Sequence, residues 1–142
     1  MDLVTPIDEE YIDDDRVMLS QTDTEGKITY VNKKFCATTA YSSNELIGST
    51  YEIIRHPDMP SVVFEKMWET ISIGQTWTGL VKNLRKDGKY YWDDLSVLPL
   101  KNDFDKIIGY ISCARVASKK NIKENEELYS KMLKNQLLEG NL

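Results

Sequence analysis

Residues 76–101 read TWTGLVKNLRKDGKYYWDDLSVLPLK, and this stretch decides the fold. Two runs rich in β-branched and aromatic residues flank Asp87 and Gly88, a dipeptide suited to a tight hairpin turn. We therefore expect two long antiparallel strands joined at this turn. A third strand is expected at 106–117, where the chain reads KIIGYISCARVA after the polar turn NDFD.

A second hairpin is expected near the start of the chain. Two β-branched and apolar runs, 16–22 and 27–32, surround a turn that contains Glu25 and Gly26. Serine, glycine and proline then interrupt the segment 33–60, so we expect several short helical turns and loops there.

One longer helix is predicted from about Met59 to Ile73. Phe64, Trp68 and Ile71 recur with helical spacing, with a proline in the first turn and a glycine just past the end. Two strands, short helices, one longer helix and three strands in that order favour an α+β fold with an antiparallel sheet over alternating βαβ units. One face of that sheet must be covered.

The negative charge is concentrated at the N-terminus. Residues 1–20 hold seven acidic side chains against Arg16 alone, which leaves 16 acidic and 17 basic residues in the remainder. A nearly neutral body has no strong field to attract nucleic acid, so we expect no binding to DNA or RNA.

The C-terminal segment 121–138 predicts a polar helix with a narrow apolar stripe. An isolated helix of this length is marginal in water, so it packs either on a partner or second copy, or back on its own domain. The stripe consists of Leu128, Tyr129, Met132, Leu133 and Leu137.

The sequence gives no sign of a membrane span or a secretion signal. No apolar stretch approaches the ~20 residues that a spanning helix needs, and the first twenty residues lack the pattern of a signal peptide. We expect a cytoplasmic protein without direct membrane insertion. Cys36 and Cys113 form no CxxC pair and lie in apolar surroundings, which favours buried free thiols.

Several motifs together resemble a known family. With TDTEGKITYVN as the first hairpin and GYISCARV as the last strand, the order of elements resembles the PAS sensor fold. The runs IRHPDMP, MWETISIGQTWTGLVKN and RKDGKYYW are similar to the flavin-binding PAS domain of aerotaxis (Aer-type) energy sensors of bacterial chemotaxis. The resemblance implies a five-stranded antiparallel sheet with short helices on one face and FAD held between them. We therefore divide the chain into an acidic leader or cap (1–19), a PAS sensor domain (20–117) and a C-terminal signalling or docking helix (118–142).

The resemblance also implies cofactor-binding residues. An isoalloxazine needs a flat apolar slot and a few donors and acceptors at its polar edge, and tryptophan faces and asparagine amides provide these. Ordinary core packing for the tryptophans, and turn or strand-end hydrogen bonds for the asparagines, remain alternatives. The predicted set is Asn32, Arg55, His56, Asp58, Trp77, Asn83 and Trp92.

The loop IIRHPDMP at 53–60 contains the only histidine, His56. A lone histidine without nearby thiolates does not assemble a structural zinc site, and nothing reveals a nucleophile for a covalent triad. We expect no metal and a positioning role. Arg55 can meet a pyrophosphate, while Asp58 can cap the following helix or orient Arg55 or His56. A purely structural loop leading into the helix is the alternative.

Two carboxylates, Asp93 and Asp94, follow Trp92 where the family usually has an apolar and a basic residue. Because alternate residues of a strand face opposite sides, one of the two is expected to point inward. An inward carboxylate would oppose an anionic reduced flavin.

The resulting hypothesis is a redox sensor and not an enzyme. It binds FAD and relays the flavin's oxidation state to a chemoreceptor-type signalling protein or domain, which could hold it at the inner face of the membrane. A homodimer through N- or C-terminal helices is a second expected contact. The alternatives are a haem-binding PAS sensor with His56 as axial ligand and a cofactor-free PAS interaction module; a blue-light sensor is disfavoured because the chain has no NCR sequence.

Overall fold

The computed structural model describes residues 3–140; residues 1–2 and 141–142, the outer ends of the predicted leader and tail, lie outside the described residues. Five strands form one antiparallel sheet in the order β2-β1-β5-β4-β3. The first and last strands therefore pair at its centre. The strands are β1 Val17–Thr22, β2 Ile28–Val31, β3 Trp77–Leu84, β4 Tyr90–Lys101 and β5 Ile107–Val116.

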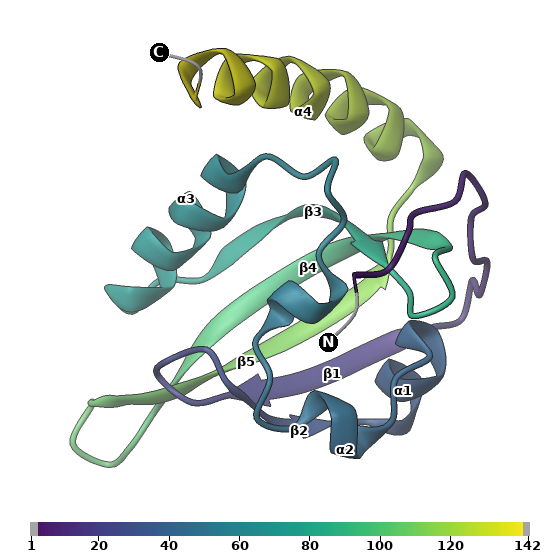
Figure 1. Ribbon diagram of the computed structural model, residues 1–142. Coiled ribbons are helices and arrows are strands. Elements are labelled where there is room, and N and C mark those ends of the chain that lie inside the picture. The colour runs from purple at the N-terminus through teal and green to yellow at the C-terminus, as the bar shows by residue number, and fades with distance from the viewer. Residues whose placement is uncertain (1–2, 141–142) are drawn as a thin grey trace.

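The short helices and α3 lie in front of one face of this sheet, and α4 lies beyond the β3 edge (Figure 1). The α+β architecture predicted from the sequence is confirmed, with five antiparallel strands and short helices on one face. The helices are α1 Lys33–Thr39, α2 Ser43–Leu46, the 3-10 turn η1 Tyr51–Ile54, α3 Ser61–Ser72 and α4 Lys119–Gly140.

Side-chain caps start the two short α-helices. Asn32 Oδ1 accepts a hydrogen bond from the backbone N–H of Phe35 at 2.9 Å, at the start of α1. Ser42 and Glu45 form a reciprocal capping box at the start of α2, with distances of 3.1 and 3.2 Å. These caps satisfy backbone donors that have no partner inside so short a helix.

The longer helix, α3, begins without a side-chain cap. Pro60 directly precedes its first residue, Ser61, and caps no N–H group. Asp58 places Oδ2 2.9 Å from Nζ of Lys82 instead. Of the two roles open to Asp58, capping the helix is therefore wrong, since its carboxylate pairs with Lys82 on β3 and also lies 3.7 Å from Nδ1 of His56.

The acidic leader runs along the turn between β3 and β4 (Figure 1). The N–H of Ile7 donates to the carbonyl of Gly88 at 2.9 Å, and the N–H of Tyr11 donates to the carbonyl of Tyr90 at 2.8 Å. We call residues 3–16 the strap. It contains no helix. A homodimer contact through these residues would therefore not be helical, and the homodimer itself stays a prediction.

The C-terminal helix packs back on its own domain. The hydroxyl of Tyr129 donates to the carbonyl of Leu80 at 2.7 Å, and its ring stacks on Trp92 with 6.2 Å between centroids. Farther along α4, Gln136 Oε1 accepts from the N–H of Ser61 at 2.7 Å. Of the two placements that the apolar stripe allowed, the structure has the intramolecular one.

The indole of Trp77 lies over Gly79. The two residues are two apart on β3 and point to the same side, and a Cβ at Gly79 would lie 2.6 Å from Cζ2 and Cη2 of the indole. The W-x-G spacing therefore lets this ring pack along its own strand, beside the apolar clusters under α3.

Gly79→Ala is expected to lower the free energy of unfolding by about 1–3 kcal/mol, because the added methyl group would overlap the indole of Trp77 and force the ring to shift. Urea denaturation followed by circular dichroism measures the change. Gly140→Ala is the matched control, since a Cβ there has no heavy atom within 4 Å. An equal effect of the two substitutions would contradict this account of the W-x-G spacing.

Candidate functional site

A cavity of about 280 Å³ lies between the sheet and α3. We call it the inner cavity. Its sheet wall includes Val81, Leu95, Val97 and Ala114. Its helical wall includes Phe64, Met67, Trp68 and Ile71. An interior space with two apolar walls and a few polar groups has the usual composition of a small-molecule site.

One polar cluster surrounds Asp93 on β4, which lines the inner cavity together with Asn83. This carboxylate is 2% exposed and contacts Arg16, with Nη2 at 3.2 Å and Nε at 3.4 Å from Oδ1. The amide of Asn83 on β3 donates to its Oδ2 at 2.9 Å. The guanidinium of Arg16 also donates to the carbonyl of Trp92. The cluster thus joins the end of the strap to β3 and β4.

Burial raises the pKa of Asp93 from 3.8 to about 6, although Arg16 and the Asn83 amide favour the charged form. The neighbouring carboxylate of Asp94 adds to the increase. Desolvation therefore outweighs the ion pair in this wall. The Asp93 carboxyl group therefore has a pKa of about 6, well above that of an ordinary aspartate.

A second polar group is the hydroxyl of Tyr51 on η1. It lies 2.6 Å from Ser20 Oγ and donates to Ser112 Oγ at 3.3 Å, so it bridges the two central strands β1 and β5. Burial raises the pKa of Tyr51, which keeps the phenol protonated. All three residues line the inner cavity.

Arg55 stands where the inner cavity opens. Its guanidinium carbon lies 3.9 Å from the centroid of the Phe64 ring, and the nearest carboxylate oxygen, on Glu52, is 3.9 Å away. The buried Nε atom has no hydrogen-bond partner among residues 3–140. A backbone bridge between Arg55 and Asn83 fixes the loop to β3. Burial lowers the pKa of Arg55, and a guanidinium stays charged in spite of this.

An outer groove of about 710 Å³ lies beside the opening. Leu3 and Val4 of the strap contribute to its lining, as does His56. Arg55 and Glu52 line both spaces, so the groove and the inner cavity share a boundary. The two spaces together can take a ligand longer than the inner cavity alone.

His56 is buried on the groove side of the loop. Its Nδ1 accepts a hydrogen bond from the backbone N–H of Asp58 at 3.0 Å, and its ring meets Tyr90 edge to face at 6.5 Å. Burial lowers the pKa of His56, and Lys82 lowers it further against the opposing effect of Asp58. The imidazole is therefore neutral at neutral pH.

The predicted site residues fall into separate places. Arg55 and Asn83 line the inner cavity, and His56 lines the outer groove. The other four line neither space: Asn32, Asp58, Trp77 and Trp92. A role in cofactor binding stays a prediction for all seven.

Trp92 and Asn32 have structural partners in these positions. Trp92 stacks on Tyr129 of α4, on the side of β4 opposite to Asp93. Besides capping α1, Asn32 donates through Nδ2 to the carbonyl of Val17 at 3.1 Å. These contacts agree with the structural alternatives that the sequence left open.

Sequence reasoning missed several residues of the inner cavity. The alternation of Tyr91, Asp93, Leu95 and Val97 along β4 places Asp93 on the inner face, and the expectation of one inward carboxylate carried that signal. Arg16 had no comparable signal, because its partner is 77 residues away and becomes adjacent only through the strand order. The missed lining residues include Ser20, Tyr51, Trp68, Tyr110 and Ser112.

Comparison with known proteins assigns the chain to a family. The sequence pattern of the PAS fold matches residues 28–114. The chain belongs to the PAS fold family. It is 39% identical over 116 residues to the aerotaxis receptor of Escherichia coli (strain K12), a match that covers 82% of this chain and 23% of the receptor. It is 30% identical over 99 residues to the nitrogen fixation regulatory protein of Klebsiella pneumoniae, covering 70% of this chain and 20% of that protein. This PAS chain thus spans about a fifth to a quarter of the length of these relatives.

Solved structures agree with the PAS assignment. A light-oxygen-voltage domain studied with a flavin analogue superposes with a TM-score of 0.67 at 23% identity, covering 86% of this chain and 87% of that one. The dark structure of the blue-light photoreceptor Aureochrome1 LOV gives 0.67 at 20% identity, covering 86% of each chain. At these identities the likeness establishes the fold alone.

No group of three or more His, Cys, Asp and Glu side chains between residues 3 and 140 is placed to hold a metal ion. Within the same described range, no helix combines the length and the apolar character that crossing a membrane requires.

Asp93→Asn is expected to change how stability depends on pH. The pKa of Asp93 in the folded protein, about 6, lies above the ordinary value of 3.8. The stability that this group contributes is thus fully present below pH ~4 and is lost as the pH rises through ~6. Relative to the variant, the wild type should lose roughly 3 kcal/mol between these limits, since one pKa unit is worth about 1.4 kcal/mol.

Denaturation with urea at a series of pH values measures this difference. Asp94→Asn is the matched control, because that side chain is exposed on the other face of β4. If the free energies of unfolding of wild type and Asp93→Asn differ by a constant amount across the range, Asp93 does not titrate as the structure requires.

Proposed function

We propose that this PAS chain is a redox sensor that binds a flavin in the inner cavity. The observation that carries the proposal is the space itself: about 280 Å³ between apolar walls, with Asn83, Asp93 and Arg55 in its lining. An isoalloxazine is flat and apolar on its faces and carries donors and acceptors along one edge, so it matches this composition. The buried Nε atom of Arg55, without a partner among residues 3–140, offers a donor to an anionic group at the opening.

The relatives support the flavin proposal at the level of protein class. The aerotaxis receptor is the relative with 39% identity, and phototropin-2 of rice is 30% identical over 92 residues, which is 65% of this chain. The solved structures with the same fold include the light-oxygen-voltage domain studied with a flavin analogue.

FAD is proposed over FMN because of the outer groove. An isoalloxazine in the inner cavity would direct its phosphate-bearing chain past Arg55, one of the residues that line both spaces. A guanidinium pairs with phosphate through parallel hydrogen bonds. The groove of about 710 Å³ then provides room for the second nucleotide half.

A bound flavin would supply reversible electron transfer, and the residues around it would convert that change into a conformational signal. Asn83 orients the Asp93 carboxylate, and Tyr51 fixes the two central strands. A hydrogen bond to a charged group is worth about 1.5–3 kcal/mol, and about 1.4 kcal/mol shifts a two-state equilibrium tenfold. One altered bond at the cavity wall is therefore sufficient for signalling.

The proposal extends to the setting in which the sensor works. In this proposal the sensor has no catalytic role. It acts in the cytoplasm on a chemoreceptor-type signalling protein, in keeping with the similarity of the chain to the aerotaxis receptor. The haem alternative is weaker, because His56 lies outside the inner cavity and its Nδ1 already accepts a hydrogen bond. The cofactor-free alternative is weaker, because the protein's own side chains leave the inner cavity open.

Ala114→Phe is expected to abolish flavin retention by filling the inner cavity from β5. Flavin per protein is measured by absorbance after purification, and the released cofactor is identified as FAD or FMN by chromatography. Arg115→Phe is the matched control, since this neighbour is exposed on the other face of the sheet. A colourless wild type after expression with added riboflavin would favour the interaction module, and a sharp haem band would favour the haem sensor.

Arg55→Met is expected to weaken FAD binding about 10- to 100-fold, the loss that follows from removing charge-assisted hydrogen bonds of about 1.5–3 kcal/mol. Riboflavin, which has no phosphate, should bind wild type and variant equally. Isothermal titration of the flavin-free protein measures both affinities, with exposed Arg115→Met as control. Equal losses for FAD and riboflavin would remove Arg55 from phosphate binding.

A further inference from the structure

We propose that Asp93 is the proton-accepting residue of the redox response and that Arg16 transmits its protonation state to the strap. The inference rests on the proposed function and names the residue through which the inner cavity controls a segment at the protein surface. It depends on two observations. The buried carboxylate of Asp93 faces the cavity, and its ion pair with Arg16 holds the last residue of the strap.

Asp93 is the carboxylate placed to respond to charge in the inner cavity. Three carboxylates line this space, and the side chains of Glu25 and Glu52 are 73% and 75% exposed, so water screens them. The side chain of Asp93 is 3% exposed. In such surroundings a negative charge on a nearby ligand acts with little screening.

The groups that face Asp93 come from every element around it. Arg16 at the end of the strap is its cation, and the Asn83 amide on β3 is its neutral donor. On its own strand, Asp94 raises its pKa and Tyr91 is buried, with a phenol pKa held well above its ordinary value. β5 places Val116 opposite Asp93. Arg55 lines the same cavity from the loop after η1.

The chemical step is the addition of one proton. A flavin held in the cavity would supply an added negative charge when an external electron donor reduces it, and such a charge would disfavour the ionised form of Asp93, which lines the same space. Asp93 then takes up a proton from solvent, one O–H bond forms, and the residue becomes a neutral carboxyl group. Because burial already raises the pKa of Asp93 to about 6, a small further increase is enough near neutral pH.

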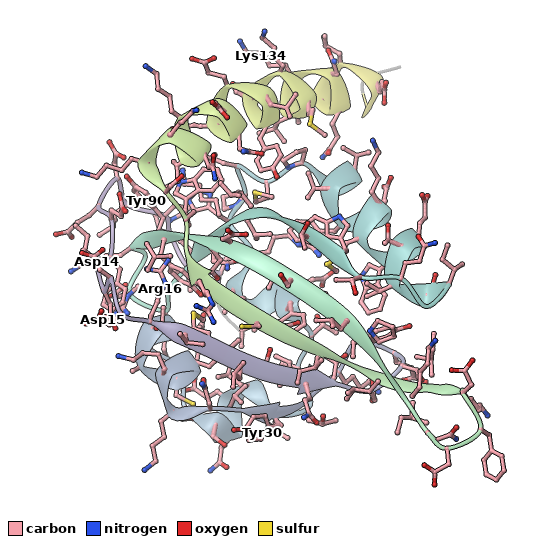
Figure 2. All side chains as sticks on the ribbon, turned by 180° about the vertical axis from the view of Figure 1, so that it is seen from behind. Asp14, Asp15, Arg16, Tyr30, Tyr90 and Lys134 are labelled. Atoms are coloured by element: carbon pink, nitrogen blue, oxygen red, sulfur yellow. The ribbon has the colours of Figure 1, made fainter. Side chains whose placement is uncertain are left out.

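Protonation removes the ionic partner of Arg16. A buried guanidinium without a counter-ion is strongly unfavourable, so the Arg16 side chain is expected to move out of the interior and become exposed to solvent. Figure 2 shows Arg16 directed inward beneath the sheet while Asp14 and Asp15 beside it point outward, and these acids can receive the released charge. The strap ends at Arg16, so its anchorage to the body is weakened there.

The rest of the strap is held by bonds that can open separately. Besides the two backbone bonds of Ile7 and Tyr11, the N–H of Tyr90 donates to the backbone carbonyl of Glu9 at 3.0 Å, and Lys34 pairs with the Asp13 carboxylate at 2.9 Å. These contacts lie along one hairpin edge and the exposed start of α1. Loss of the Arg16 anchor is expected to free this edge and to change the outer groove, whose lining includes Leu3 and Val4 of the strap.

Hydrogen–deuterium exchange of strap peptides tests the inference. In flavin-loaded wild type near neutral pH, reduction with dithionite should speed exchange within residues 3–16 several-fold and leave β1 unchanged. In Asp93→Asn, exchange of the strap should be the same in both redox states, while Asp94→Asn should keep the wild-type response. Identical exchange in oxidised and reduced wild type, with flavin bound, would overturn the inference.

A second arm needs no flavin. In flavin-free wild type, lowering the pH through about 6 should speed strap exchange, after correction for intrinsic chemical rates, and Asp93→Asn should not respond. Failure to bind flavin would contradict the proposed function but leave this arm intact. An unchanged strap across the pH series would overturn the link between Asp93 and Arg16.

Discussion

The buried contact of Asp93 with Arg16 and Asn83 is the constraint on which the rest of the site depends. It joins three segments that are far apart in the chain, the end of the strap, β3 and β4, at the wall of the inner cavity. Replacing a buried ion pair by apolar residues is often neutral or stabilising, so such a pair is weak support for stability itself. Because the pair lies beside a ligand-sized space, the ionisation of Asp93 can respond to the charge of a ligand bound there.

Much of the fold followed from local signals in the sequence. The Asp87–Gly88 dipeptide predicted the long hairpin. The spacing of Phe64, Trp68 and Ile71 predicted α3, with a starting residue within two positions of the observed one, Ser61. The strap was not predictable, because it pairs with the hairpin through backbone atoms and carries no strand pattern. The docking of α4 was one of two open alternatives, since an apolar stripe does not identify its partner.

The site was predicted in part, for an identifiable physical reason. The bridge between Arg55 and Asn83 brings the RHPDMP loop to β3, so two residues from different motifs line one cavity. Alternation along β4 places Trp92 opposite to Asp93, so an inward carboxylate implied an outward tryptophan. The sequence contained that relation, whereas the pairing of Asp93 with Arg16 depended on the complete strand order.

Proton uptake on reduction tests the central claim most directly. Purified flavin-loaded protein is reduced in weakly buffered solution near neutral pH, and an indicator dye records the protons taken up per flavin. The account predicts that wild type takes up more protons than Asp93→Asn, with the difference vanishing well below pH 6, where Asp93 is already protonated. Equal uptake by the two proteins at every pH would contradict the role of Asp93 as the charge detector of the cavity.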